Sequence, residues 1–463
     1  MNTKQLSKIG VPFGKPMEEA INVIKYYAMF KKNKKKALRD ILEGVIEDPK
    51  QYLEDTMLFQ LSKALIEHKK LWSNKAFYRQ WGKDIDPNAI QQMENACRLP
   101  ISVQGALMPD AHLGYGLPIG GVLATYNSVI PYAVGVDIAC RMKLSVYNLP
   151  VEVLDMNEHI LISAIEKETR FGIGCSFKDK RDHDVMDEDW SITEITKKMK
   201  DKAWSQLGTS GSGNHFVEFG IFTIKKKNVF NDNTTEEPYL ALLTHSGSRG
   251  AGANVANHYS KLAMELRKGI PEDRKHLAWL DLDTEEGQEY WNAMELMGRY
   301  ASANHKCIHD AIAKNLEAEV LIDIENHHNF AWKETHHGKE VIVHRKGATP
   351  AGKGVLGVIP GTMASETYIV EGKGLSDSLN SASHGAGRVM SRKQAKKTFN
   401  WEEVNKQLKE RKVKLLSAGI DESPGVYKDI NKVMREQCDL VDIVATFEPR
   451  LVKMAPQGER PED

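Results

Sequence analysis

GTSGSGNHFVEFGIFTI, residues 208–224, is the stretch that decides the fold class of this chain. Its glycines superficially resemble a dinucleotide-binding fingerprint, but such a site needs a helix directly after the glycines. The run from His215 to Ile224 is instead rich in aromatic and β-branched residues, which is typical of a β-strand. The stretch therefore predicts a turn that leads into a strand, and it argues against a dinucleotide site.

The same combination of a glycine-rich turn and a short apolar run recurs from about residue 97 onward. Such runs indicate the strands of one or two sheets. Strands are predicted at 120–126, 215–224, 239–245, 320–326, 341–344, 354–360 and 366–372. Helices are predicted at 151–169, 251–268, 284–317 and 427–436. We therefore expect an α+β fold, in which residues 96–463 form one large domain of central β-sheets flanked by helices.

Residues 1–95 show a different pattern from the rest of the chain. From Met17 to Leu71, apolar residues recur at every third or fourth position, with Lys and Glu between them. That period indicates helices, so we expect a helical N-terminal extension. Its run KKNKKK, residues 31–36, is typical of a solvated helix face, and a contact with RNA phosphates is the alternative. The polar segment 225–238 predicts a surface hairpin.

Composition narrows the class of protein. The chain has 463 residues with 41% hydrophobic content, and its 63 Lys and Arg balance 63 Asp and Glu. Without a net basic charge, any nucleic-acid partner must be held by a local patch. The five cysteines are scattered singly, which favours a reduced, cytoplasmic protein. No apolar run reaches the roughly 18 residues of a membrane span, so we expect no membrane partner.

Metal-competent side chains stand in most of the glycine-dense turns. A single histidine is more often structural than a ligand, but several turns of the same kind together favour a site at strand ends. A carboxylate, a thiol and several imidazoles suit a borderline metal such as Zn, Mn, Fe or Co, and a shared Asp or Cys could bridge two ions. The candidate ligands are Asp137, Cys140, His215, His245 and His328.

Other histidines have weaker claims to a functional role. His305 and His309 share one helical face, but no Glu follows His305, and apolar neighbours favour packing. The HH pair at 336–337 fits a turn. The residues leave the role of His344 open, and the two cations after it, Arg345 and Lys346, are candidate contacts for phosphate or RNA.

A candidate nucleotide pocket gathers small residues and backbone N–H groups, which cradle phosphates. It comprises PGTM at 360–363, Thr367, HGAG at 384–387 and the turn at Tyr427 and Lys428. No P-loop sequence is present. His384 lies among Ser, Ala and Gly, and the residues alone leave three roles open for it: ligand, base or nucleophile.

Nine motifs occur in one order along residues 97–454. They are PDAHLGYGLPIGG, GVDIAC, GTSGSGNHFVEFG, HSGSRGAG, HHN, RKGAT, PGTM, SHGAGRVMSR and DESPGVYKDI. This combination is highly specific, and in it the chain resembles the RtcB-type RNA ligases, as a divergent member. The first 95 residues carry no motif of that family.

The resemblance implies an enzyme that uses GTP and two Mn²⁺ ions, in RNA repair or tRNA splicing. It would join a 2′,3′-cyclic phosphate or 3′-phosphate end of RNA to a 5′-hydroxyl end, through a histidine–GMP and an RNA(3′)pp(5′)G intermediate. His384 matches the histidine that carries GMP. The metal ligands of the family fall on Asp137, Cys140, His215, His245 and His328.

The guanylate contacts of the family fall on a larger set, of which Glu218 is the candidate for guanine selectivity. The set is Asn214, His215, Phe216, Val217, Glu218, His328, Asn329, Pro360, Gly361, Thr362, Met363, Thr367, His384, Gly385, Ala386, Gly387, Tyr427 and Lys453. Asp110 and His112 are candidates for supporting or proton-transfer roles. Cations near the mouth would hold RNA phosphates, namely Arg249, Arg345, Lys346, Arg388 and Arg392. Some members of the family depend on a small activator protein, and we expect a monomer.

The sequence departs from the family pattern at four places. Arg141 replaces a glycine after the metal-binding cysteine and could alter the floor of that site. Leu113 replaces a tryptophan, Thr362 replaces a serine, and ten further residues follow Lys453. These departures suggest that the natural RNA need not be a spliced tRNA.

Two other functions remain open. A metal-dependent RNA-end phosphoesterase would keep the metal ligands but would not need His384 or Lys453. A non-ligating RNA-end-binding repair protein would be expected to lose metal ligands, whereas all five positions are filled. Retention of both sets favours the ligase.

Overall fold

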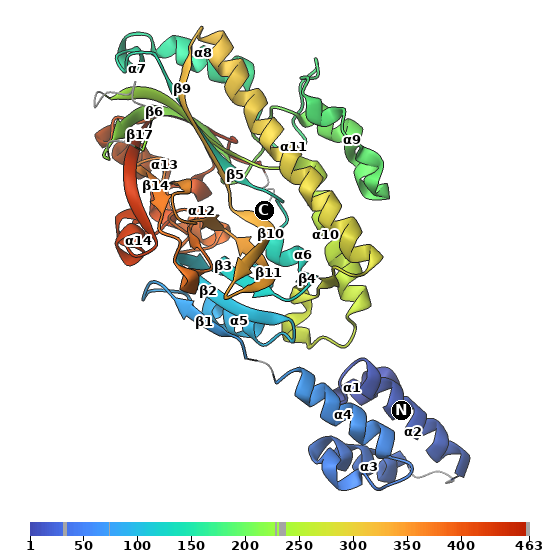
Figure 1. Ribbon diagram of the computed structural model, residues 1–463. Helices are drawn as coiled ribbons and strands as arrows, with labels where there is room; N and C mark the ends of the chain where they lie inside the picture. The colour runs from blue at the N-terminus through green and yellow to red at the C-terminus, as the bar shows by residue number, and fades with distance from the viewer. Residues whose placement is uncertain (31–34, 74, 227–228, 231–237, 460–463) are drawn as a thin grey trace.

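The computed structural model describes residues 1–30, 35–73, 75–226, 229–230 and 238–459. Within these residues a small helical unit precedes a larger body of β-sheets and covering helices (Figure 1). The expected α+β class with a helical N-terminal segment is thereby confirmed. No described helix is both long and apolar enough to cross a membrane.

The N-terminal unit closes on an apolar core of its own, in which Leu42 and Leu61 are fully buried. Its described elements are α1 (Thr3–Lys8), α2 (Lys15–Phe30), α3 (Lys35–Glu47), η1 (Pro49–Tyr52) and α4 (Phe59–Leu71). The KKNKKK run and the proposed hairpin at 225–238 lie largely outside the described residues.

The first sheet begins inside the segment expected to be helical. β1 (Phe77–Gln80) pairs in parallel with β2 (Ser102–His112), and α5 (Pro87–Cys97) connects them. A purely helical extension to residue 95 is therefore wrong for residues 77–80. A run of four residues is too short to show a strand period, and β2 provides the pairing that makes it a strand.

Five strands form the smaller sheet, in the order β1-β2-β3-β11-β10. The last three are β3 (Ile119–Thr125), β11 (Lys339–Lys346) and β10 (Asn329–His336). β3 pairs antiparallel with both β2 and β11. The sheet therefore brings the PDAHLG motif at the end of β2 near the RKGAT motif at the end of β11.

The larger sheet runs β13-β14-β17-β6-β7-β5-β9, with β16 paired to β17. Its strands are β5 (Arg141–Tyr147), β6 (Phe216–Ile224), β7 (Tyr239–Ser246), β9 (Val320–His327), β13 (Leu356–Ile359), β14 (Thr367–Gly372), β16 (Lys414–Ser417) and β17 (Val441–Met454). The backbone N–H of Val358 in β13 donates to the Asn326 side chain in β9 at 2.8 Å. This contact joins the two edges, so the sheet is nearly closed.

Long helices cover this sheet, of which α11 (Glu285–Asn315) is the longest described (Figure 1). His305 and His309 of α11 are buried, and both rings bond to Thr244 Oγ1 of β7, at 3.0 and 2.8 Å. The packing role predicted for this pair is confirmed. The neighbouring helices are α8 (Glu158–Glu168), α9 (Glu194–Gln206) and α10 (Arg249–Leu266).

Short elements complete the body. They are β4 (Ser128–Val129), α6 (Pro131–Val134), α7 (Val153–Met156), η2 (Asp184–Met186), η3 (Trp190–Ile192), η4 (Glu272–Leu277), β8 (Leu280–Asp281), β12 (Ala348–Pro350), η5 (Ser376–Ser378), β15 (Ser381–Ser383), α12 (Arg392–Thr398), α13 (Trp401–Glu410), η6 (Ile420–Glu422), η7 (Pro424–Val426) and α14 (Ile430–Glu436). The pairing of β12 with β15 sets His384 directly after a buried strand.

Candidate metal and nucleotide site

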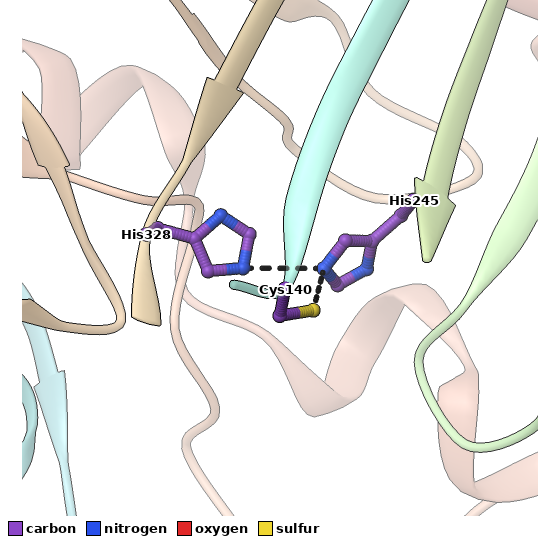
Figure 2. A group of neighbouring side chains, drawn as sticks. All are labelled: Cys140, His245 and His328. Atoms are coloured by element: carbon purple, nitrogen blue, oxygen red, sulfur yellow. Dashed lines mark hydrogen bonds between the residues drawn. The ribbon is translucent and has the colours of Figure 1, made fainter. Parts of the chain in front are cut away.

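Three candidate metal ligands lie at the ends of three neighbouring strands (Figure 2). Cys140 precedes β5, His245 lies near the end of β7, and His328 follows β9. Sγ of Cys140 is 3.1 Å from Nε2 of His245, and that nitrogen is 3.3 Å from Nε2 of His328. Because β5 pairs with β7 on one side and β9 on the other, sheet register brings these distant residues together.

A second group shares Cys140. Nε2 of His215 lies 3.4 Å from Sγ of Cys140 and 3.1 Å from Oδ2 of Asp137. The other carboxylate oxygen of Asp137 accepts the backbone N–H of Ser248 at 2.9 Å. A Cβ on Gly247 would lie 2.2 Å from that carboxylate, so the HSGSRG turn needs glycine there.

Backbone carbonyls orient two of the ligand rings. Nδ1 of His215 lies 3.0 Å from the Ser210 carbonyl, and Nδ1 of His245 lies 3.0 Å from the Asn214 carbonyl. Each Nδ1–H donates to its carbonyl, so each Nε2 lone pair faces the centre. Burial lowers the pKa of His245 to about 3, which keeps its ring neutral.

This set of donors fits a divalent metal ion. One thiol, three imidazoles and one carboxylate converge, and the cysteine and histidines are buried. Imidazoles that stay neutral and a thiol that can ionise are the forms that bind such ions. Cys140 belongs to both groups and could therefore bridge two ions.

A cavity of about 830 Å³ extends outward from the ligands, and His245 and His328 form part of its wall. This volume is of the order that holds a small-molecule ligand. Most of the predicted guanylate contacts line it, namely Asn214, Phe216, Glu218, Pro360, Gly361, Thr362, Met363, Thr367, His384, Gly385, Ala386, Gly387 and Tyr427.

His384 lies between the metal-ligand groups and the smaller sheet. Its ring centroid is 5.0 Å from that of His328. Nδ1 of His384 bonds to Oδ2 of Asp110 at 2.7 Å, and the His384 backbone N–H donates to the same oxygen at 3.1 Å. Burial alone would raise the pKa of Asp110, but the hydrogen bond from His384 holds it below the usual value. An ionised carboxylate can only accept, so Nδ1 carries the proton and Nε2 keeps its lone pair.

Lys428 fixes the strand end that carries Asp110. Its ammonium group donates to the carbonyls of Pro109 and Ala111, at 2.8 and 3.1 Å, on either side of the aspartate. His112 lies beside the pair and its Nδ1 contacts the Asp110 carbonyl at 3.0 Å. Burial lowers the pKa of His112 to about 4, so this ring is neutral near pH 7.

Glu218 lies in the cavity wall, and no charged side chain among the described residues offsets its burial. It is 4% exposed, and burial raises its pKa to about 8. Because this pKa is close to physiological pH, the carboxyl group can change between its neutral and ionised forms. It can therefore offer a ligand a carbonyl oxygen and a second oxygen that titrates.

Four predicted guanylate contacts do not line the cavity, and one of them, His215, lies among the candidate metal ligands instead. Val217 faces the core on the other side of β6. Asn329 uses its side chain to bind the Gly347 N–H and the Asp137 carbonyl, at 2.8 and 3.3 Å. Lys453 bonds to Glu166 at 2.5 Å, whereas Val452 and Met454 line the cavity, because successive residues of β17 point to opposite faces.

The prediction that Arg345 contacts RNA is wrong. Its side chain is 1% exposed, and its guanidinium binds Glu334, Ser381 and the Leu379 carbonyl. His344, left open by the sequence, is a structural residue: its Nε2 accepts the Ile130 N–H at 2.9 Å.

Other predicted cations are also largely enclosed. Lys346 is buried, donates to the Tyr115 carbonyl at 2.5 Å, and has its pKa lowered to about 7 by burial. Arg249 is buried beside Nδ1 of His215 at 3.2 Å. Arg388 and Arg392 line the cavity, where both contact Glu422.

Arg141 links the turn that carries Cys140 to the helix behind the sheet. Its Nε donates to the Ala139 carbonyl at 3.2 Å, and its guanidinium also donates to the Gly298 carbonyl of α11 at 2.8 Å. It pairs with Glu325 of the neighbouring strand β9. Sequence reasoning missed Asp84, Asp86 and Met142, which also line the cavity, because none of them stands in a motif.

The fold and the site define a protein that holds a cluster of metal-competent side chains beneath a nucleotide-sized cavity. A family model described as tRNA-splicing ligase RtcB matches residues 92–454, and the chain belongs to that family. The chain is 33% identical to the RNA-splicing ligase RtcB of Escherichia coli K12 over 416 residues, which cover 82% of this chain and 98% of the relative.

Archaeal relatives give the same result. The tRNA-splicing ligase RtcB of Nanoarchaeum equitans is 31% identical, with 79% of this chain and 91% of the relative covered. That of Thermococcus kodakarensis is 28% identical, with 78% and 89% covered. The resemblance inferred from the motifs is therefore confirmed.

Proposed function

We propose that the protein is a GTP- and Mn²⁺-dependent ligase that joins a 3′-phosphate or 2′,3′-cyclic phosphate end of RNA to a 5′-hydroxyl end. Membership of the RtcB family supports a nucleic acid ligase. The proposal goes further in naming GTP as cosubstrate, His384 as the residue that carries GMP, and RNA repair or tRNA splicing as the role.

The geometry of His384 is the observation that carries this proposal. Asp110 holds Nδ1 at 2.7 Å, and the ring lies against the candidate ligand His328. A histidine nucleophile needs one nitrogen held and protonated while the other attacks. A structural histidine would have no need to present Nε2 to an open cavity.

In the first step, Nε2 of His384 attacks the α-phosphorus of GTP. A P–N bond forms, the bond to the bridging oxygen breaks, and pyrophosphate leaves. Asp110 keeps the proton on Nδ1 and stabilises the positive charge that the ring gains. The Asp, Cys and His groups would hold divalent ions, which would supply charge neutralisation for phosphoryl transfer.

Two further transfers complete the reaction. An oxygen of the RNA 3′-phosphate attacks the phosphorus of the histidine-bound GMP, which gives RNA(3′)pp(5′)G and frees His384. The 5′-hydroxyl oxygen of the second RNA then attacks the 3′-phosphorus, and GMP leaves. A cyclic end is first opened by water to the 3′-phosphate.

Recognition of the guanylate rests on the wall of the cavity. The Glu218 carboxyl group can accept hydrogen bonds from the guanine N1–H and N2–H₂ edge, which adenine does not offer in the same pattern. The small residues from Gly385 to Gly387 let the backbone approach a phosphate closely.

Guanylylation tests the proposal directly. The protein is incubated with α-labelled GTP and Mn²⁺, denatured, and examined for label on the chain, with His384→Ala alongside. We expect acid-labile, alkali-stable label on the unchanged protein and none on the variant. Label that persists on His384→Ala, or its absence from both, contradicts the assignment.

A phosphoesterase that opens cyclic ends without ligation is the second candidate. The candidate metal ligands favour it equally, but it gives no role to the bond between Asp110 and His384. Incubation with RNA bearing a cyclic phosphate separates the two, because the phosphoesterase would open the ring equally well in His384→Ala and never join ends.

A further inference from the structure

Charge is divided unevenly between the N-terminal helical unit and the rest of the chain. Residues 1–75 contain 15 Lys and Arg against nine Asp and Glu, which gives a net charge of +6. Because the whole chain balances at 63 of each, residues 76–463 carry −6. The basic charge that an RNA-binding protein needs is therefore concentrated in one small unit.

This unit is separate from the part of the chain that resembles other members of the family. The family match begins at residue 92, whereas the unit comprises residues 1–75 and its last helix, α4, ends at Leu71. Its own apolar core holds the helices together. The catalytic body thus carries an added basic module, whose sequence the family pattern does not explain.

The module is attached beside the mouth of the cavity. Trp72, at the end of α4, stacks edge-on against Trp279 with ring centroids 6.3 Å apart. Two residues of η4 lie at this junction: Arg274 is 5.6 Å from the Trp72 ring, and His276 is 6.2 Å from the ring of Tyr115. Tyr115 is 68% exposed and lines the cavity. A strand of RNA that leaves the cavity past Tyr115 therefore passes this junction.

The surface of the module at this end offers cations without partners. Lys69 and Lys70 in the last turn of α4, and Lys75 after it, are exposed and form no ion pair within the described residues. Elsewhere in the module, Lys15 and Arg39 pair with glutamates one helical turn away. The negative C-terminal end of the helix dipole explains why lysines are favoured at positions 69 and 70. It does not explain Lys75, which lies beyond the helix.

Several buried hydrogen-bond donors also lie at this junction. In the part of the chain that the structure describes, Nε1 of Trp72 and both Nε and Nη1 of Arg274 are shielded from solvent and lack a hydrogen-bond acceptor. Nε of Arg274 forms an ion pair with Oδ2 of Asp273 at 3.5 Å. These atoms are shielded from solvent, so Arg274 contributes positive potential at the junction and not a direct contact with phosphate.

We infer that the N-terminal helical unit is a second RNA-binding element, which holds the phosphate backbone of the strand whose end lies in the cavity. This inference rests on the proposed function for the identity of the strand. The contacts are to phosphodiester oxygens, so the element binds without regard to base sequence and raises affinity for RNA, not the rate of the chemical steps.

The test compares the full-length protein with a triple variant, Lys69→Ala, Lys70→Ala and Lys75→Ala. Fluorescence anisotropy measures binding of a single-stranded oligoribonucleotide with a 3′-phosphate over a series of KCl concentrations. Loss of three phosphate contacts should lower the slope of log Kd against log salt by about 2 and weaken binding roughly tenfold. Thermal unfolding of the variant should be unchanged.

A matched triple variant on exposed lysines elsewhere, Lys197→Ala, Lys198→Ala and Lys406→Ala, controls for overall charge. We expect it to keep the affinity and slope of the unchanged protein. Equal losses in both variants, or no loss in the first, would overturn the inference; the latter is the result expected if the module binds an acidic protein instead. Guanylylation by GTP alone should be equal in all three proteins, so a failure of the proposed chemistry is seen separately.

Discussion

One carboxylate oxygen of Asp110 receives both the ring Nδ1–H and the backbone N–H of His384, at 2.7 and 3.1 Å. The aspartate lies at the end of a strand of the smaller sheet, and the histidine follows a short strand more than 270 residues later. A single buried oxygen therefore fixes both the position of the histidine and the orientation of its ring.

Replacement of Asp110 by Asn should slow guanylylation by about 10²- to 10³-fold, because a neutral amide stabilises the charged ring poorly and can favour the wrong tautomer. The rate of label incorporation in a single turnover measures the effect. Asp310→Asn, an exposed aspartate of α11 that pairs with Lys306, is the control. Equal rates for Asp110→Asn and the control would remove Asp110 from the mechanism.

Glu218 gives a prediction on pH. Its pKa of about 8 means that the carboxyl is mostly protonated at pH 7 and half ionised at pH 8. If guanine binds to the ionised form, GTP affinity should rise roughly fivefold between these pH values. Glu218→Gln cannot ionise and should show a flat profile with weaker discrimination against ATP. A profile that stays steep in the variant would assign the titration to another group.

Cys140 is shared by both ligand groups, so its loss should affect every bound ion. Cys140→Ser should weaken metal binding by at least about tenfold, since a serine hydroxyl remains protonated and is a poor ligand for borderline metals. Titration with Co²⁺ monitors this, because a thiolate–cobalt charge-transfer band should appear in the unchanged protein and be absent from Cys140→Ser. Cys438→Ser, at an exposed cysteine, should keep the band. A band retained in Cys140→Ser would place the ion elsewhere.

A comparison of Gly387 with Gly354 separates the cost of a steric clash from the cost of backbone strain. It has φ +75°, and a Cβ there would lie 2.0 Å from the Asp110 carbonyl oxygen. Gly354 has nearly the same φ, +77°, with nothing within 4 Å of its Cβ position. Backbone strain should lower the free energy of unfolding by about 1–3 kcal/mol in each Gly→Ala variant. The clash should lower it further in Gly387→Ala, which should also lose guanylylation. Equal melting temperatures of the two variants would contradict this.

The local patterns of the chain were sufficient to predict seven of the 17 described strands and the two longest helices, α10 and α11. The strands β6, β7, β9 and β14 lie within two residues of their predicted bounds. Ten described strands were not predicted, and two of them, β5 and β17, show a physical reason for this. β5 carries Arg141 and Lys143, whose charges are neutralised by acids of β9, and β17 contains Pro449 at a register shift. Ion pairs between strands and a register shift at a proline both depend on a partner strand, so neither can be predicted from one segment alone.

The candidate ligands could be predicted because each stands in a glycine-rich turn, but their convergence depends on sheet order. β5 lies between β7 and β9, and no local pattern specifies that neighbourhood. The dependence on distant segments also explains why the structure places Lys453 and Arg345 away from their expected contacts. Lys453 lies on the far face of its strand beside Glu166, and Arg345 is neutralised by Glu334 across a hairpin. Pairing between distant segments decided each of these side chains.

Cys140 and the histidines around it meet only when β5, β6, β7 and β9 are assembled in one sheet. An unfolded chain holds the same side chains too far apart to chelate an ion, so binding and assembly are thermodynamically linked. The apparent melting temperature of the protein should therefore climb with the concentration of free metal. The supply of metal in a cell would then govern how much of this enzyme persists, as well as how fast it works.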